Sequence, residues 1–349
     1  MLLYNLFYLS LPLLYVICQL LKKGRKYFLF IIGCLMILLL TFRGITVGSD
    51  TITYYNIFNW TSSINLFEAQ QSNIEYGYLL LNRFIHFVNG NFTLLLFVIS
   101  LITIFGILQF IYNFSDNIFM SIIVFVGFTY YFMAFNISRQ FLAIGIDLIA
   151  STYLIRGKKW KSLLLIIIAG LMHNAGYLYL ILWILIDIKV TKKVFTIFLA
   201  FITAISLPAT KFIGQYMINN QRYNAIVNSS NAGKGMFGIL FSLSLLMLLI
   251  FMIINFNFNN SNLLDRYVLY SFTLIVVLNL LVIFFPYLGR IRYSFEVLIV
   301  VCIPYLVKEY SLERFIPVIN IGLLPFGLLF MNILIPNNVF YGIIPYVFV

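Results

Sequence analysis

The sequence predicts an all-α polytopic membrane protein, with one integral membrane domain over residues 1–349. Two observations carry this prediction. Of the 349 residues, 63% are hydrophobic and only 9% are charged, whereas about a quarter of the residues in a soluble domain are charged. Apolar runs of about 20 residues, the length that crosses a bilayer as a helix, recur from end to end. No stretch between these runs is long enough to fold as a soluble domain.

Residues 1–21 form the first apolar run. They lack the basic start and the small-residue cleavage site of a signal peptide, so we expect a retained first helix. The three cysteines lie inside apolar runs without disulfide or zinc spacing, and we expect them to be small core residues. The net charge of +12 is mainly a topology signal, because Lys and Arg gather on the cytoplasmic side of membrane proteins.

Three basic clusters assign the two sides of the membrane, and they lie at 22–26, 156–161 and 189–193. If all three face the cytoplasm, the segment after the second apolar run (27–42) is external. An odd number of crossings must then separate Arg43 from Arg156, and the apolar runs 92–113, 117–135 and 138–156 supply three. We therefore predict an external loop over 43–91, in which 75–89 is an amphipathic helix at the membrane surface.

The segment between the second and third clusters predicts a helical hairpin. Both clusters should be cytoplasmic, yet only about 25 apolar residues separate them, and two full crossings need about 40. A re-entrant or tilted pair of short helices, bent near 172–176, satisfies both limits. Irregular backbone at membrane depth requires protein or a wet cavity around it, so His173 would face a cavity. The alternative is one long helix, with the 189–193 cluster tolerated outside.

The rest of the chain predicts five more crossings, at 194–208, 235–256, 266–286, 291–307 and 315–335. The total is then about ten full transmembrane helices, besides the hairpin and the amphipathic helix. This topology makes 209–234 a second external loop. It also places residues 336–349 outside.

The same topology brings a second set of arginines to the outer face, comprising Arg43, Arg139, Arg222, Arg290 and Arg292. Ionisable residues at membrane depth are commonly functional, and guanidinium forks suit phosphate oxygens. Several arginines on one wet face therefore indicate a diphosphate or another polyanion. Arg139 is the strongest candidate, because it opens a helix whose free N–H groups also favour an anion. For any one arginine, the alternative is a structural ion pair or contact with lipid headgroups.

Three further ionisable groups, Asp50, Glu75 and His173, can reach the same space. Asp147 should balance an arginine inside the bundle, and Glu296 should hold the guanidinium of the arginine one turn before it.

Motifs for metal ions and nucleotides are absent from the sequence. No set of His, Cys or carboxylate residues has zinc spacing, and no Asp-x-Asp pair is present to carry a divalent cation. No glycine-rich phosphate loop or nucleophile elbow occurs either. We therefore expect a metal-independent protein without a cofactor.

Six short blocks resemble, in the same order, the EpsG/Wzy-type bacterial polysaccharide polymerases. They are FRG…VGSDTITYY (42–55), EYGYLLL (75–81), FNISRQFLA (135–143), LMHNAGYL (171–178), GRIRYSF (289–295) and IIPY (343–346). The resemblance covers nearly the whole chain, and the VGSDT, arginine-glutamine and histidine blocks together are fairly specific. Ser49 stands where that family usually has Thr, and Tyr76 where Pro is common.

The resemblance implies an enzyme of the bacterial cytoplasmic membrane with a GT-C-like bundle and a periplasm-facing active site. Such an enzyme joins oligosaccharide repeat units carried on undecaprenyl diphosphate, beside a flippase and a chain-length regulator of the same pathway, and binds no nucleic acid. The expected catalytic residues are His173, Arg139 and Asp50. We prefer His173 as the general base for the acceptor hydroxyl, because a neutral imidazole among arginines stays available near pH 7, and Asp50 is the other candidate. The expected diphosphate ligands are Arg139, Arg290, Arg292, Arg43 and Arg222, and the expected sugar ligands are Tyr54, Glu75 and Gln140. A flippase or transporter of the same lipid-linked glycan, and an O-antigen ligase, are the rival functions. The product stays open among capsule, exopolysaccharide and O-antigen.

Overall fold

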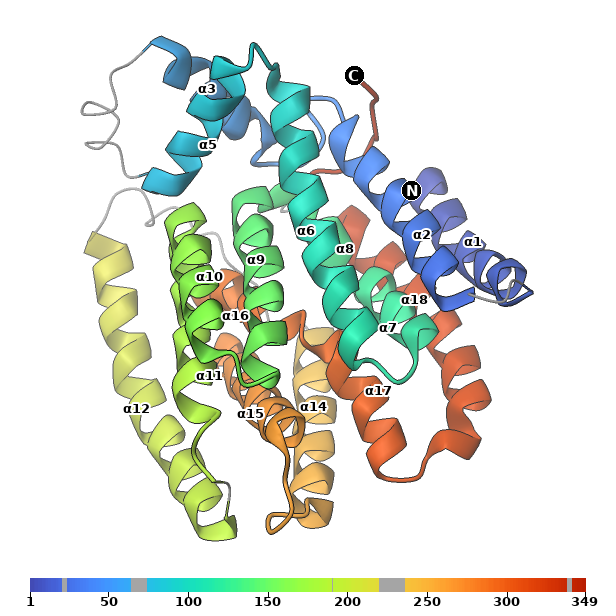
Figure 1. The fold of residues 1–349 in the computed structure, drawn as a ribbon, viewed down its shortest axis with the longest axis vertical. Helices are drawn as coiled ribbons and strands as arrows, with labels where there is room; N and C mark the ends of the chain where they lie inside the picture. Colours follow the sequence, from blue (N-terminus) through green and yellow to red (C-terminus); the bar gives the residue numbers. More distant parts are fainter. Residues whose placement is uncertain (21–23, 64–73, 190, 220–235, 338–340) are drawn as a thin grey trace. The chain divides into compact units, whose positions relative to one another are not determined.

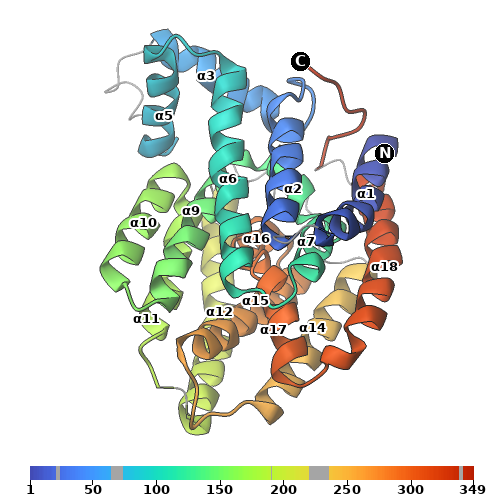
Figure 2. The ribbon, with the colours of Figure 1, turned by 45° about the vertical axis from the view of Figure 1, so that its right-hand side comes forward.

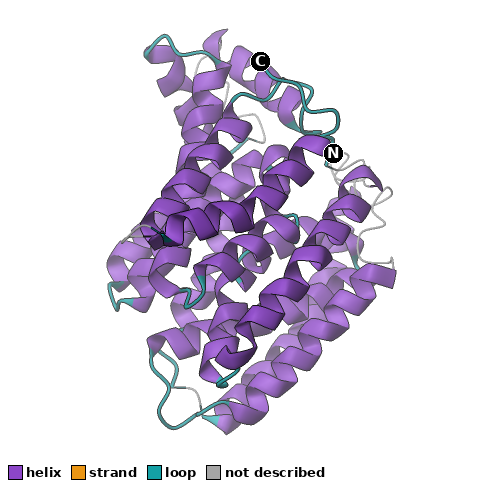
Figure 3. Ribbon diagram, turned by 90° about the vertical axis from the view of Figure 1, so that its right-hand side faces the viewer, coloured by secondary structure: helices purple, strands orange, loops and turns teal. Residues whose placement is uncertain are grey.

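The computed structural model describes residues 1–20, 24–63, 74–189, 191–219, 236–337 and 341–349. These residues are helical almost throughout, and Figure 3 shows no strand among them. A single isolated bridge, between Arg43 and Phe348, is the β-like pairing of the described part. The all-α prediction is confirmed.

The chain folds as two compact units. Unit 1 comprises Met1–Leu154, Lys158–Leu180 and Ile303–Val349, and unit 2 comprises Ile155–Gly157 and Ile181–Cys302. Both units consist of apolar helices, so the division does not decide whether residues 1–349 act as one membrane domain, and that stays a prediction.

Unit 1 contains most of the helices labelled in Figure 1. Within it α2 packs on α6, α18 on α7, and α1 on both α2 and α7. Its elements are α1 (Leu2–Gln19), α2 (Gly24–Thr41), α3 (Thr51–Ser63), α5 (Tyr76–Phe87), α6 (Phe92–Phe114), α7 (Ile118–Gly127), α8 (Tyr130–Asn136), α9 (Ser138–Ile155), α10 (Lys159–Met172), η1 (Asn174–Tyr179), η3 (Glu313–Phe315) and α18 (Ile316–Asn337).

Unit 2 is built around one central helix, α15, against which α12, α14 and α16 pack. A capping box starts α15, because the Asn262 side chain accepts from the N–H of Asp265 while the Asp265 carboxylate accepts from the N–H of Asn262. The elements are α11 (Leu180–Leu185), α12 (Lys192–Asn219), α14 (Met236–Asn255), α15 (Leu263–Phe284), η2 (Pro286–Leu288), α16 (Gly289–Glu296) and the start of α17 (Ile299–Glu309).

Six helices of the described part are long and apolar enough to cross a membrane, or seven if α7 and α8, which meet at 48°, form one bent span. This is fewer than the expected ten or so. One reason is that α9 carries Arg139 and Asp147, whose charges lower its mean hydropathy. Another is that the expected crossing at 291–307 is divided between α16 and α17. The polytopic character is confirmed, and the number of crossings stays a prediction.

Helix α12 runs further than expected, to Asn219 instead of 208, and Pro208 lies inside it. The predicted external loop over 209–234 therefore begins later than the sequence suggested. Its remainder, which includes Arg222, lies outside the described residues.

The predicted amphipathic helix at 75–89 is present as α5, with a buried face that includes Tyr78, Asn82 and Ile85. It packs on α3, α6 and α10. The imidazole of His86 stacks on the ring of Phe58 at 4.0 Å, which fixes α5 against α3. The sequence did not predict α3. Figures 1 and 2 both place α3, α5 and the C-terminus at one end of unit 1.

The predicted bend of the hairpin is also present. Helix α10 ends at Met172, His173 is extended (φ −158°, ψ 130°), and η1 begins at Asn174. The chain reverses here, since a Cβ on Gly176 would lie 2.6 Å from the carbonyl carbon of Ala169 in α10. The structure therefore contains two short helices instead of the single long helix that was the alternative.

Candidate active site

The end of unit 1 that carries α3 and α5 brings together residues that are far apart in the sequence. It contains Arg43, Asp50, Glu75, Arg139 and His173. Two arginines lie within this group, and their surroundings differ. They are described in turn.

Arg43 is buried, with 1% of its surface exposed. Its Nη1 donates to the carbonyl of Leu40 at 2.7 Å, and its Nη2 donates to Oγ of Ser138 at 2.8 Å. The guanidinium also lies 5.5 Å from the ring of Phe135. Burial lowers the pKa of Arg43 to about 10, so the side chain is still charged at neutral pH. Both of these donors serve the fold, while Nε of Arg43 has no hydrogen-bond partner among the described residues. Direct binding of a diphosphate by Arg43 stays a prediction.

The loop over residues 42–50 has a second anchor at Asn136, the last residue of α8. The Asn136 Oδ1 accepts from Oγ of Ser49 at 2.6 Å and from the N–H of Asp50 at 2.9 Å. Gly48 makes the turn possible, because its φ is +95° and a Cβ there would lie 2.3 Å from the Phe135 carbonyl. Asp50 is thereby placed immediately before α3, at the same end as Arg139.

The C-terminal segment, residues 341–349, runs beside this loop. The N–H of Gly44 donates to Val347 at 2.7 Å, and the N–H of Gly48 donates to Gly342 at 2.7 Å. The hydroxyl of Tyr346 donates to the carbonyl of Leu39 at 2.8 Å. Burial raises the pKa of this hydroxyl to about 12, so it remains a donor at neutral pH. The IIPY block therefore supports the block that contains Arg43, although nothing in the sequence indicated this pairing.

Arg139 forms an ion pair with Glu75. Its Nη1 lies 2.6 Å from Oε2 of Glu75, and the two side chains are 12% and 11% exposed. The guanidinium lies 5.6 Å from the ring of Tyr54 and 5.2 Å from the ring of Tyr78, within cation–π range of both. Its Nε is buried and meets no acceptor among the described residues. The carboxylate of Glu75 therefore satisfies only part of the guanidinium.

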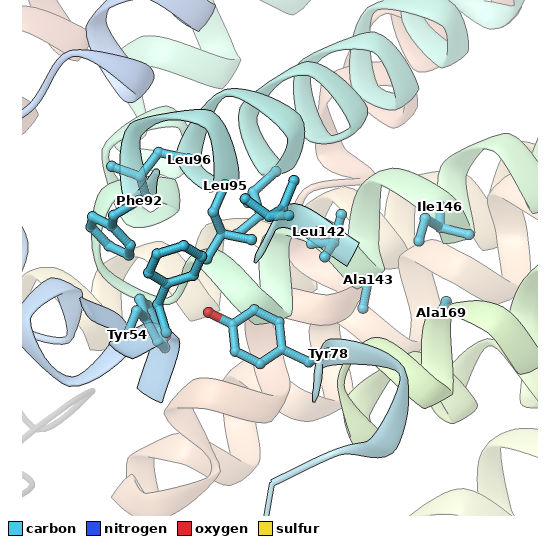
Figure 4. Close-up of a cluster of buried hydrophobic side chains, with 12 residues drawn as sticks. Tyr54, Tyr78, Phe92, Leu95, Leu96, Leu142, Ala143, Ile146 and Ala169 are labelled. Carbon is cyan, nitrogen blue, oxygen red and sulfur yellow. The ribbon is translucent and has the colours of Figure 1, made fainter. Parts of the chain in front are cut away.

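A hydrophobic cluster supports this ion pair. Figure 4 shows Tyr54 and Tyr78 among side chains from α3, α5, α6, α9 and α10. The two tyrosine rings meet edge to face, with centroids 6.3 Å apart. Because both rings are buried in the cluster, they hold the guanidinium of Arg139 independently of Glu75. Tyr78 had not been predicted as a site residue.

His173 lies at the break between α10 and η1. Its Nδ1 accepts from the N–H of Ala175 at 3.2 Å, so the neutral ring carries its proton on Nε2. The next N–H, that of Asn174, points to Oε1 of Glu75 at 3.4 Å. Gly77 permits this approach, since a Cβ there would lie 2.7 Å from the carbonyl of Leu171. Glu75 thus connects Arg139 to the histidine block.

A second arginine–carboxylate pair lies in unit 2. The Nε of Arg292 is 3.0 Å from Oε2 of Glu296, one helical turn later, as the sequence predicted. The remaining nitrogens of Arg292 face Oδ1 of Asn279 at 3.5 Å and the hydroxyl of Tyr293 at 3.3 Å. Arg290 lies in the same helix, α16. Diphosphate binding by Arg290, Arg292 and Arg222 stays a prediction.

The model of the EpsG family matches residues 26–348. The chain belongs to the EpsG family. The resemblance to EpsG/Wzy-type polymerases is thereby confirmed. Neither the search of curated proteins nor the search of solved structures found a match. Membership supports a general role as a polysaccharide polymerase, a glycosyltransferase-like enzyme in a multi-pass membrane protein.

Other predicted residues of this EpsG-family protein lie inside the helix bundle. Gln140 and Tyr54 are buried, so their binding of sugars stays a prediction. Asp147 is buried in α9, and neither of its carboxylate oxygens has a hydrogen-bond partner among the described residues. The arginine that we expected beside it is therefore not found in this part of the chain. No group of three or more metal-ligating side chains lies together in the described ranges, and metal independence stays a prediction.

Proposed function

We propose that this protein polymerises oligosaccharide repeat units carried on undecaprenyl diphosphate, at the outer face of the bacterial cytoplasmic membrane. The observation that carries the proposal is the guanidinium of Arg139, which lies against two tyrosine rings and beside a carboxylate. Family membership supports the general activity. The lipid carrier, the side of the membrane and the residue roles are our proposal.

The proposed reaction is a single glycosyl transfer. A hydroxyl oxygen on the non-reducing sugar of one lipid-linked repeat bonds to the anomeric carbon of the growing glycan. The bond between that carbon and the diphosphate oxygen breaks, and undecaprenyl diphosphate leaves with the electron pair. The hydroxyl proton passes to a general base. Catalysis then depends on stabilising the leaving charge and on removing the proton.

Arg139 stabilises the leaving diphosphate in this proposal. A planar guanidinium presents paired N–H donors to phosphate oxygens, and donors that are held in place before reaction need no reorganisation in the transition state. The tyrosine pair supplies this positioning. The buried Nε of Arg139 is a further donor that Glu75 leaves unused.

His173 serves as a hydrogen-bond donor, and Asp50 as the general base. The sequence favoured His173 as base, but its Nδ1 already accepts from the N–H of Ala175. The proton on Nε2 then makes the ring a donor to a phosphate or sugar oxygen. Asp50 is anchored at the same end of unit 1 through Asn136.

Substitution of His173 distinguishes these roles. We expect His173→Gln to keep part of the activity, because an amide N–H can replace the imidazole donor, and His173→Ala to lose it. Asp50→Asn should abolish polymerisation. If His173→Gln and His173→Ala lose activity equally while Asp50→Asn stays active, His173 and not Asp50 is the general base.

The decisive experiment reconstitutes the purified protein with a synthetic undecaprenyl-diphosphate repeat unit. A ladder of glycan lengths is expected for the wild type, and none for a folded Arg139→Ala variant. Transfer to a different lipid acceptor without a ladder would indicate a ligase. Translocation of the repeat without any transfer would indicate a flippase and overturn the proposal.

A further inference from the structure

We infer that the carboxylate of Glu75 occupies the anion site of Arg139 in the resting protein, and that the substrate diphosphate must displace it. The inference rests on the proposed function for the nature of the substrate. It changes the role of Glu75, which the sequence assigned to sugar binding. It also adds the backbone N–H of Asn174 to the diphosphate site.

The contacts of Glu75 are those that a phosphate group would make. Oε2 accepts from Nη1 of Arg139 at 2.6 Å, and Oε1 faces the N–H of Asn174 at 3.4 Å. One carboxylate therefore spans a guanidinium and a main-chain donor from two different segments. Two oxygens of a phosphate group accept from the same kinds of donor. Both anions cannot occupy these donors at once, so binding of one excludes the other.

Glu75 can leave without disturbing its own helix. It is the N-cap residue of α5, yet its side chain makes no capping hydrogen bond there. Arg139 stays in place when the carboxylate leaves, because Tyr54 and Tyr78 pack against the guanidinium and are themselves buried. The site that results has a positioned cation and a main-chain N–H.

The resident carboxylate favours ligands with high charge. A monoanion that enters the site exchanges one negative charge for another and gains little. A diphosphate carries more charge and more acceptor oxygens, so it can use the guanidinium and the N–H of Asn174 together and gain more from the exchange. Glu75 therefore makes the site selective for the lipid diphosphate over the carboxylates of acidic sugars and the monoanionic headgroups of lipids.

The test measures the binding of inorganic pyrophosphate to the purified full-length protein by calorimetry. We expect Glu75→Gln to bind at least about tenfold more tightly than the wild type, because the amide cannot compete as an anion, and Arg139→Gln to bind much more weakly. Asp116→Asn is the matched control, since it removes one negative charge from an ion pair with Lys308 elsewhere in unit 1. It should leave the affinity unchanged.

Three outcomes would overturn the inference. Weaker binding by Glu75→Gln would mean that Glu75 positions Arg139 for the ligand. Equal pyrophosphate affinity of the wild type and Glu75→Gln would show that the Glu75 carboxylate does not compete with the ligand. An equal gain in affinity in Asp116→Asn would show that any lost negative charge has the same effect. If Glu75→Gln does not fold, Glu75→Asp, whose shorter side chain draws the carboxylate away from Arg139, should show the tighter binding. The glycan ladder tests the proposed function separately. Tighter pyrophosphate binding by Glu75→Gln without a ladder from the wild type would support the inference about Glu75 and contradict the proposed polymerase activity.

Discussion

Ser138→Ala tests whether Arg43 is a structural arginine. The substitution removes the Oγ that accepts from Nη2 of Arg43 at 2.8 Å and leaves a charged donor buried without that partner. A hydrogen bond to a charged group contributes about 1.5–3 kcal/mol. The higher helix propensity of alanine offsets about 0.5 kcal/mol. We therefore expect the free energy of unfolding to fall by about 1–2.5 kcal/mol.

The assay is equilibrium unfolding in mixed detergent micelles, followed by circular dichroism. Thr152→Val in the same helix is the control, because Thr152 is buried and, within the described part of the chain, its Oγ1 donates to the carbonyl of Leu148 one turn earlier. Loss of such a local bond changes helix stability little. A Ser138→Ala variant as stable as Thr152→Val would refute the assignment of Arg43 to the fold.

Three further predictions concern the same end of unit 1 and one surface ion pair. Gly77→Val should push α5 from the carbonyl of Leu171, which a Cβ would approach to 2.7 Å, and a lower melting temperature together with loss of the glycan ladder is the expected readout. Deletion of residues 343–349 removes main-chain partners of the 42–50 loop, so limited proteolysis should cut that loop faster than in the full chain. Lys308→Ala breaks an exposed ion pair with Asp116 and should change the free energy of unfolding by less than about 1 kcal/mol.

Much of the fold could be predicted because membrane insertion leaves few choices. Apolar length and the distribution of basic residues located α1, α2, α6, α14 and α15 closely. Counting the crossings needed between basic clusters located the bend at His173, which helix propensity alone would not indicate. They also separated α5 from the crossings. These predictions depend on hydropathy and charge, which are local properties of the sequence.

The features that the sequence did not predict depend on interactions between distant segments. Thr129 adopts a positive φ of 68° between α7 and α8, a bend within the expected crossing at 117–135 that the sequence did not indicate. Its Oγ1 lies 2.6 Å from the hydroxyl of Tyr341, more than two hundred residues later. The partners of Arg43 are likewise neutral groups, a carbonyl and a serine hydroxyl, which carry no charge pattern to detect. Sequence reasoning therefore found the arginines of the site and missed the residues that hold them.

Arg43 and Arg139 show how the acceptors around a guanidinium decide its use. Arg43 donates to the Leu40 carbonyl and to Oγ of Ser138. Both acceptors are neutral and belong to helices that pack in the core, so neither can leave without local unfolding. Arg139 donates to a carboxylate on a single rotatable side chain, and the aromatic contacts that position it remain when that side chain turns away. A guanidinium can exchange its acceptor for a substrate only in the second arrangement. Lys therefore cannot replace Arg139 well, because an ammonium group lacks both the planar group that lies against the rings of Tyr54 and Tyr78 and the fork of N–H donors that suits a diphosphate.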